Sequence, residues 1–225
     1  MKLDILAFAA HPDDVELSCG GTIIKQVKLG YKVGVVDLTQ GELGSRGTAE
    51  TRKIEATNSS KILGLSVREN LKMADGFFEI SQENKLKIVQ IIRKYQPKVV
   101  FANSINDRHP DHGRASKLVS EACFLAGLAK IITTENGLTQ KAYRPEVIYH
   151  YIQDYYIKPD FIVDVSDFID LKIESVKAYK TQFFDPNSLE PPTPISGEDF
   201  FEFLKARSRE FGRLIQREFG EGFTV

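Results

Sequence analysis

The amino-acid sequence predicts an α/β fold in which a mostly parallel sheet is flanked by helices and followed by a smaller C-terminal elaboration. Two observations predict this fold class. Short apolar runs alternate with helical patterns through the first half of the chain, which is the rhythm of β-α-β-α folds. The first run, residues 3–10, is apolar at almost every position, as expected of a central parallel strand that is covered on both faces.

The other elements of the first half are predicted from apolar periodicity and from Gly, Ser or Pro at their boundaries. They are a helix opened by Gly20-Gly21 and stopped at Gly30, a strand at 33–36, a helix at 48–63 ended by Gly64, a helix behind the N-cap Ser81 closed by Pro97, a strand at 99–102, and a helix marked by Ala115, Leu118, Val119 and Ala122.

The C-terminal part changes character. It offers strands at 147–152 and 161–165, a helix at 168–179, a loop at 185–199 that holds four prolines, and a last helix carrying Leu204, Phe211 and Ile215. A loop of that length in a compact domain is either mobile or functional. We therefore expect one Rossmann-like domain over residues 1–225, with a core at about 1–145 and the C-terminal elaboration at about 146–225.

Composition excludes several classes of function. Lys plus Arg number 30 against 31 for Asp plus Glu, so the chain has no electrostatic footprint for nucleic acid or for an anionic membrane. The two cysteines, Cys19 and Cys123, are far apart, which argues against a disulfide framework or a thiolate zinc site. Neither a signal peptide nor a membrane span is recognisable, and we expect a cytoplasmic protein with a small-molecule substrate.

Two short segments carry residue types that bind metal. His11-Pro12-Asp13-Asp14 directly follows the first strand, and His109-Pro110-Asp111-His112 lies shortly after the strand that ends at Ala102. Ligands of open α/β sheets bind at the carboxyl ends of strands. Imidazole and carboxylate are the usual ligands of catalytic zinc, which keeps one position for water. Either segment alone would be as well explained by a helix N-cap, but together they hold three of the four histidines.

The sequences AHPDDVELSCGGT and RHPDH resemble the LmbE/PIG-L family of zinc-dependent sugar N-deacetylases. DLTQGELGSRGTAETRKIEA and AYKTQF resemble its bacillithiol-pathway branch, the N-acetylglucosaminyl-malate deacetylases, and the resemblance runs over nearly the whole chain. It implies that His11, Asp14 and His112 bind Zn²⁺ or another divalent metal and that Asp13 is the general base. It also implies a homo-oligomer, for which a hexamer is one arrangement.

Further site residues are expected around this set. His109 is expected to stabilise the tetrahedral intermediate or to protonate the leaving amine, and Asp111 either orients its imidazole or caps a helix. Arg52 resembles a family position that faces the substrate, with a solvated helix charge as the alternative. Arg46, in a Gly-rich loop, is the candidate reader of the malate carboxylates that the branch substrate carries.

The expected activity is metal-assisted hydrolysis of an amide other than a peptide bond, with N-acetylglucosaminyl malate as the substrate. Two alternatives remain at this point. One is deacetylation of another N-acetylated sugar, such as a chitobiose or an inositol conjugate. The other is a non-catalytic sugar- or nucleotide-binding module, against which Asp13 argues because a binding module needs no base beside the metal.

Overall fold

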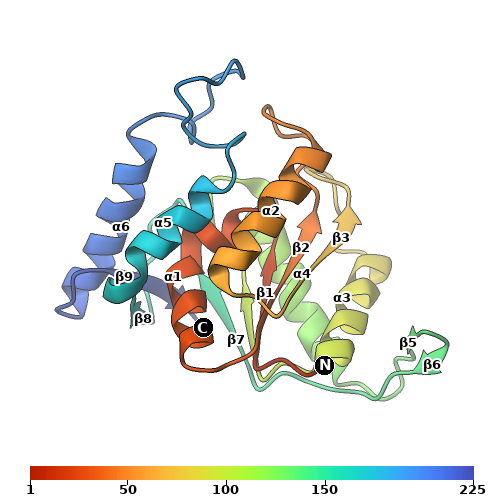
Figure 1. Cartoon of the computed structure of the whole chain (residues 1–225). Coiled ribbons are helices and arrows are strands. Elements are labelled where there is room, and N and C mark those ends of the chain that lie inside the picture. The colour runs from red at the N-terminus through yellow and green to blue at the C-terminus, as the bar shows by residue number, and fades with distance from the viewer.

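The computed structural model describes all residues 1–225 and contains a seven-stranded sheet with the order β3-β2-β1-β4-β7-β9-β8 (Figure 1). The strands are β1 (Ile5–Ala9), β2 (Val33–Thr39), β3 (Val67–Met73), β4 (Val99–Ala102), β7 (Val147–Tyr151), β8 (Phe161–Asp164) and β9 (Gly220–Thr224). The pairs from β3 through β7 are parallel, and β9 pairs antiparallel with both β7 and β8. The predicted fold class is confirmed.

Helices cover both faces of this sheet. They are α1 (Asp14–Lys28), α2 (Ala49–Leu63), α3 (Gln82–Tyr95), α4 (Pro110–Ala126), α5 (Ile169–Lys177) and α6 (Phe200–Leu214), with a 3₁₀ turn at Ser166–Phe168 and a small hairpin of β5 (Thr134–Glu135) and β6 (Leu138–Thr139). Figure 1 shows α1, α2 and α5 together on one face and α3 and α4 on the other.

The alternation of β1 explains why its sequence is apolar throughout. Leu6 and Phe8 belong to the core that includes α3 and α4, whereas Ala7 and Ala9 belong to the core that includes α1. Both sets are fully buried, because successive side chains of a strand point to opposite faces and here both faces are covered.

The predicted ends of α2 and the predicted start of α3 are confirmed at their caps. The Thr48 side chain accepts a hydrogen bond from the Thr51 backbone N–H, and α2 ends at Gly64 in the left-handed conformation with φ of 71°. Ser81 accepts from the Asn84 N–H at the start of α3. Each of these helix ends depends on residues within three or four positions of one another, so the local sequence is sufficient to predict it.

The structure differs from the sequence-based expectation at α1, β3 and β9, and it also contains the small hairpin of β5 and β6, which the sequence did not predict. Helix α1 starts at Asp14 rather than at Gly20, and non-helical dihedral angles at Cys19 kink it. Strand β3 was not predicted because it is an edge strand with charged, half-exposed residues. Strand β9 was not predicted because glycines are poor strand formers. Gly220 lies so close to Ile162 on β8 that an added Cβ would be 2.6 Å from its Cγ2.

The segment after residue 145 continues the main sheet rather than forming a separate layer. β7 pairs with β4 from Val99↔Val147 to Ala102↔His150, and β9 and β8 extend the sheet beyond it. No helix in the chain is both long and apolar enough to span a membrane.

The sheet order places the two histidine segments side by side. β1 and β4 are adjacent parallel strands, and the chain order reverses between them, since β2 and β3 lie on the other side of β1. Such a reversal leaves a crevice beyond the carboxyl ends of the two strands. His11 follows β1 and His109 follows β4, so both segments reach this crevice.

Candidate active site

The turn after β1 directs neighbouring side chains in different directions. Asp13 precedes α1 with φ of 120° and ψ of −23°, a region that residues other than glycine rarely adopt. Its carboxylate makes no capping bond to the helix, although aspartate is a preferred N-cap. Strain of this kind costs about 1–3 kcal/mol and clusters at functional sites. The turn therefore directs Asp13 and Asp14 toward different partners.

Asp14 is the centre of a buried polar cluster. Its Oδ1 lies 3.0 Å from His112 Nε2 and accepts a hydrogen bond from Gln153 Nε2 at 3.1 Å. Its Oδ2 accepts from the His11 backbone N–H at 2.9 Å and from Asn103 Nδ2 at 3.0 Å. The same Oδ2 lies 3.6 Å from His11 Nδ1. These contacts hold the carboxylate between the two imidazoles.

The other ring nitrogen of each of these histidines faces a further carboxylate. His11 Nε2 lies 3.0 Å from Asp75 Oδ1 and 3.3 Å from Asp111 Oδ2. His112 Nδ1 is hydrogen-bonded to Asp107. Histidines that ligate metals characteristically donate their second N–H to a carboxylate, which fixes the tautomer and the ring orientation. His11 Nδ1 and His112 Nε2 are thereby left to face Asp14.

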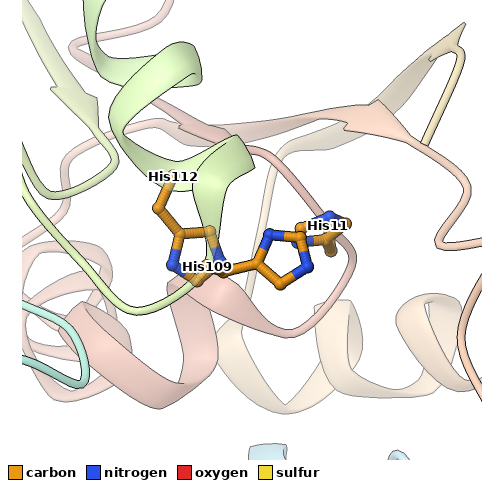
Figure 2. Close-up of side chains that lie close together, drawn as sticks. All are labelled: His11, His109 and His112. Carbon is orange, nitrogen blue, oxygen red and sulfur yellow. The ribbon is translucent and has the colours of Figure 1, made fainter. Parts of the chain in front are cut away.

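His109 is the third imidazole of the cluster. Figure 2 shows it beside His112 at the start of α4, with His11 reaching the same place from the turn after β1. Its ring centroid lies 4.6 Å from that of His11 and 5.1 Å from that of His112. His109 Nδ1 accepts from the Asp111 backbone N–H at 3.2 Å, so the proton of the neutral ring is on Nε2. Burial and the two neighbouring histidines lower the pKa of His109, which favours its neutral form.

The donor set fits a divalent metal. Ligand atoms of His11, His109 and His112 lie within 4.8 Å of one another, and the Asp14 carboxylate lies between two of these rings. Imidazole nitrogen and carboxylate oxygen are the donors that zinc prefers in catalytic sites. A second group, formed by His11, Asp75 and Asp111, has ligand atoms equally close together and shares His11 with the first.

The surrounding charge favours a cation at this point. Burial by itself lowers the pKa of His112, but Asp14 and Asp107 outweigh it and raise the pKa to about 9. Burial likewise disfavours the protonated form of His11, but Asp111, Asp14 and Asp75 raise its pKa well above the ordinary value. A field that stabilises positive charge on two buried imidazoles also stabilises a bound metal ion.

Asp13 lies in the same cavity lining as this cluster and beside Arg52. Burial raises the pKa of the Asp13 carboxyl to about 7, while the guanidinium of Arg52 acts in the opposite direction. Arg52 Nη2 lies 3.9 Å from Asp13 Oδ2 and is hydrogen-bonded to Gln182. A carboxyl group poised near neutral pH in a cavity has the property that general base catalysis requires.

One cavity of about 450 Å³ joins these groups. Its polar wall holds His11, Asp13, Asp14, His109 and His112. Its apolar wall is formed by one face of α6 over three helical turns, with Phe200, Phe203, Leu204 and Phe211. The lining also includes four cations, Arg52, Arg108, Lys172 and Arg207. The cavity is therefore large enough to take more than an acetamide group.

Six of the eight residues predicted from the sequence line this cavity, namely His11, Asp13, Asp14, His109, His112 and Arg52. The role expected of Asp111 is different in the structure. Its carboxylate faces His11, accepts from the Gly76 backbone N–H at 2.8 Å and pairs with Arg114, because it points from the first turn of α4 toward β3. The Asp111 carboxylate has no hydrogen bond to the His109 imidazole, which accepts instead from the Asp111 backbone N–H, and the N-cap of α4 is His109 itself.

Arg46 is not brought into the cavity. Its Nε donates to Thr181 O at 2.6 Å, and its Nη2 donates to Ser188 Oγ at 2.8 Å. The guanidinium is buried under the Pro-rich loop, so its donors are used by the chain itself. Arg46 is therefore not among the residues that line the cavity.

Four polar residues of the cluster were not predicted: Asn103, Gln153, Asp75 and Asp107. Asn103 directly follows the predicted strand at 99–102, and this position at a strand end was a usable signal. Asp75 follows β3, which the sequence did not predict. Gln153 follows β7, whose place beside β4 only the sheet order shows.

Comparison with known proteins identifies a family and several similar proteins. Residues 6–123 match the family described as PIG-L: GlcNAc-PI de-N-acetylase. A diacetylchitobiose deacetylase from Thermococcus kodakarensis is 28% identical over 234 residues, covering 97% of this chain and 81% of that protein.

Two solved structures show the same fold over nearly the whole chain. A conserved protein from Thermus thermophilus has a TM-score of 0.87 and 39% identity, covering 99% of this chain and 94% of that one. The N,N'-diacetylchitobiose deacetylase from Pyrococcus horikoshii, complexed with its inhibitor MPG, has a TM-score of 0.82 and 27% identity, covering 98% and 82%. The matched residues 6–123 run from β1 into α4 and contain both histidine segments, and on this match the chain belongs to the PIG-L family of GlcNAc-PI de-N-acetylases.

Proposed function

We propose that the protein is a metal-dependent hydrolase that removes the N-acetyl group from an N-acetylglucosamine conjugate. The observation that carries this proposal is that one cavity joins a His–Asp–His donor set to a separate buried carboxylate, Asp13. The two diacetylchitobiose deacetylases among the similar proteins support the same substrate class, since their names describe an N-acetylated sugar.

The residues that would hold the metal are His11, Asp14 and His112. They offer two imidazole nitrogens and one carboxylate, and the second nitrogen of each imidazole is already directed to another carboxylate. In such sites zinc supplies Lewis-acid activation of water and of a carbonyl group.

The other residues have roles that follow from their positions. Asp13 accepts a proton from the attacking water, whose oxygen adds to the acetyl carbon to give a tetrahedral intermediate, from which the carbon–nitrogen bond then breaks. His109 presents Nε2–H to the cavity and donates to the carbonyl oxygen or to the leaving amine. The proton taken up by Asp13 is passed to that amine, and the products are acetate and a glucosamine conjugate.

Among possible conjugates we propose N-acetylglucosaminyl malate, the substrate of the bacillithiol branch. With Arg46 outside the cavity, the carboxylates of malate need another cation. Lys172 is paired with Glu221, and the guanidinium of Arg207 donates to the backbone carbonyls of Gln153 and Asp154. Arg108 is 47% exposed and pairs only with Asp154, so it has free donors at the cavity mouth.

The test is acetate release by protein of known metal content from three substrates: N-acetylglucosaminyl malate, N-acetylglucosamine and diacetylchitobiose. We expect the malate conjugate to have the highest kcat/KM, and we expect a chelator to abolish turnover and zinc to restore it. Preference for diacetylchitobiose would overturn the malate assignment and leave sugar deacetylation in place. No acetate from any N-acetylated sugar would overturn the proposed function.

A further inference from the structure

The guanidinium of Arg52 is held in place by a single side chain. Within the chain its only hydrogen bond is the one that Nη2 donates to Gln182 Oε1, and its Nε is buried without a partner. The contact with Asp13 Oδ2, at 3.9 Å, is an ion pair too long for a hydrogen bond. The direction in which Arg52 points at the cavity therefore depends on Gln182.

Gly41 and Gly44 lie close against the guanidinium. A Cβ added to Gly41 would lie 2.2 Å from Arg52 Nη1, and one added to Gly44 would lie 3.3 Å from Nη2. These glycines leave room for the guanidinium but offer it no side-chain acceptor. The glycines restrict the conformations that the Arg52 side chain can adopt, and the hydrogen bond to Gln182 selects one of these conformations.

Gln182 is itself fixed from the other end. Its Nε2 donates to Arg46 O at 2.7 Å and to Thr181 Oγ1 at 2.8 Å. Thr181 is clamped to α2, because its N–H and O–H donate to the two oxygens of Glu55 at 2.7 and 2.9 Å. Glu55 lies one helical turn beyond Arg52, so the clamp places Gln182 directly over the Arg52 side chain.

The same residues reach the Pro-rich loop. The side chain of Arg46 donates to Thr181 O, to Ser188 Oγ and to Pro191 O, the last at 3.5 Å. A continuous chain of contacts thus runs from Asp13 through Arg52, Gln182 and Arg46 to the loop over residues 185–199.

We propose that Gln182 is a positioning residue that holds Arg52 against Asp13 and couples it to the Pro-rich loop through Arg46. The inference rests on the proposed function for its catalytic consequence. In this proposal Arg46 supports Gln182 and binds the Pro-rich loop, and it does not bind the substrate.

A double-mutant cycle tests this positioning. Gln182→Met keeps the length of the side chain and removes its hydrogen bonds, and it should lower kcat/KM for acetate release by roughly 10- to 100-fold, the usual effect of losing a bond to a charged group. In an Arg52→Ala background the same change should have almost no further effect, since Gln182 then has nothing to position. An equal loss in both backgrounds would overturn the proposal.

Two further variants guard against a general folding defect. Gln182→Glu keeps an acceptor for Arg52, and it should retain more of the activity than Gln182→Met. Gln140→Met is the matched control, because Gln140 Nε2 donates to Gln90 O at 2.9 Å and the residue lies outside the cavity lining. It should leave kcat/KM unchanged. A Gln182→Glu variant as slow as Gln182→Met would contradict the role of the Arg52 contact.

Amide hydrogen exchange tests the coupling without any activity. Gln182→Met and Arg46→Met should both speed exchange over residues 185–190, while α3 exchanges as in the wild type. Unchanged exchange of the loop in Gln182→Met would overturn the coupling. Wild-type protein that releases no acetate would instead overturn the proposed function, and the two failures are thus distinguishable.

Discussion

At the scale of single residues, the site depends on two adjacent aspartates that face different partners. Asp14 lies between His11 and His112, and Asp13 lies beside Arg52. The strained φ of 120° at Asp13 makes this separation possible, since an ordinary helical start would use Asp13 as a cap. The proposed function assigns separate chemical roles to these two adjacent residues.

The first prediction separates these roles. Asp13→Asn should keep the metal while kcat falls by about 10²–10⁴-fold, the usual contribution of a general base. Asp14→Asn should lose the metal, because it removes the carboxylate between the two imidazoles. Elemental analysis and steady-state kinetics on both variants check this. Near-normal turnover by Asp13→Asn would assign the base elsewhere, with His109 next to be tested.

The second prediction concerns the malate. Arg108→Ala should lower kcat/KM for N-acetylglucosaminyl malate by roughly 10-fold or more and leave N-acetylglucosamine nearly unaffected, because only the former has carboxylates to lose. Arg46→Ala is the comparison, and it should slow both substrates equally, since its guanidinium binds the loop. A selective effect of Arg46→Ala would restore that residue as the reader of the malate.

At the scale of elements, a residue distant in sequence caps the part of α1 that follows its kink. Cys19 has non-helical angles, and the N–H groups of Gly21 and Thr22 follow directly after this kink. Glu221 of β9 accepts from both, at 3.0 and 2.7 Å. The helical stretch expected from Gly20-Gly21 is thus the second segment of α1, and its cap comes from the far end of the chain.

The two neighbouring glycines of this kink should respond in opposite ways to alanine. A Cβ at Gly20 would make ordinary contacts, the nearest at 3.5 Å, so Gly20→Ala should keep or raise the free energy of unfolding, by up to about 1 kcal/mol. A Cβ at Gly21 would lie 2.9 Å from Val165 Cβ, so Gly21→Ala should lower it by about 1–3 kcal/mol. Denaturant unfolding of both variants checks this, and equal effects would contradict it.

At the scale of the whole molecule, a buried ion pair ties the C-terminal strand to the helices that carry the site. Lys172 Nζ of α5 donates to Glu221 Oε1 of β9 at 2.7 Å, and the two side chains are only 3% and 1% exposed. Through Gly21 and Thr22 the same carboxylate holds α1, the helix that begins at Asp14.

Breaking this pair should affect global stability. Glu221→Ala leaves Lys172 buried without a counter-charge and should lower the free energy of unfolding by about 3–5 kcal/mol. Glu218→Ala is the control, since its pair with Arg209 is about 60% exposed on both sides and contributes about 0–1 kcal/mol. Denaturant unfolding of both variants measures the difference, and similar losses would refute the assignment.

Local patterns in the sequence were sufficient to predict the fold class, β1, β4, the caps of α2 and α3, and the position of both histidine segments at strand ends. Each depends on residues within a few positions of one another: continuous apolar runs, a Thr or Ser cap, a terminal glycine. That His11, Asp14 and His112 approach one another depends on the strand order, because only adjacent parallel strands bring their carboxyl ends together, and the family resemblance had already grouped these three residues.

Tertiary structure alone decided the carboxylates behind the histidines, the direction of Arg46, and the strands β3 and β9. Asp75 and Asp107 face His11 and His112 because separate segments pack at one sheet edge, and no local periodicity records that packing. Arg46 could have pointed to the cavity or to the loop, and it is the hydrogen bonds with residues more than 130 positions away that select the loop. Strand β3 has charged residues because it lies at the sheet edge, and strand β9 has glycines because neighbouring segments pack closely against it. Neither strand therefore has a local sequence pattern that predicts it.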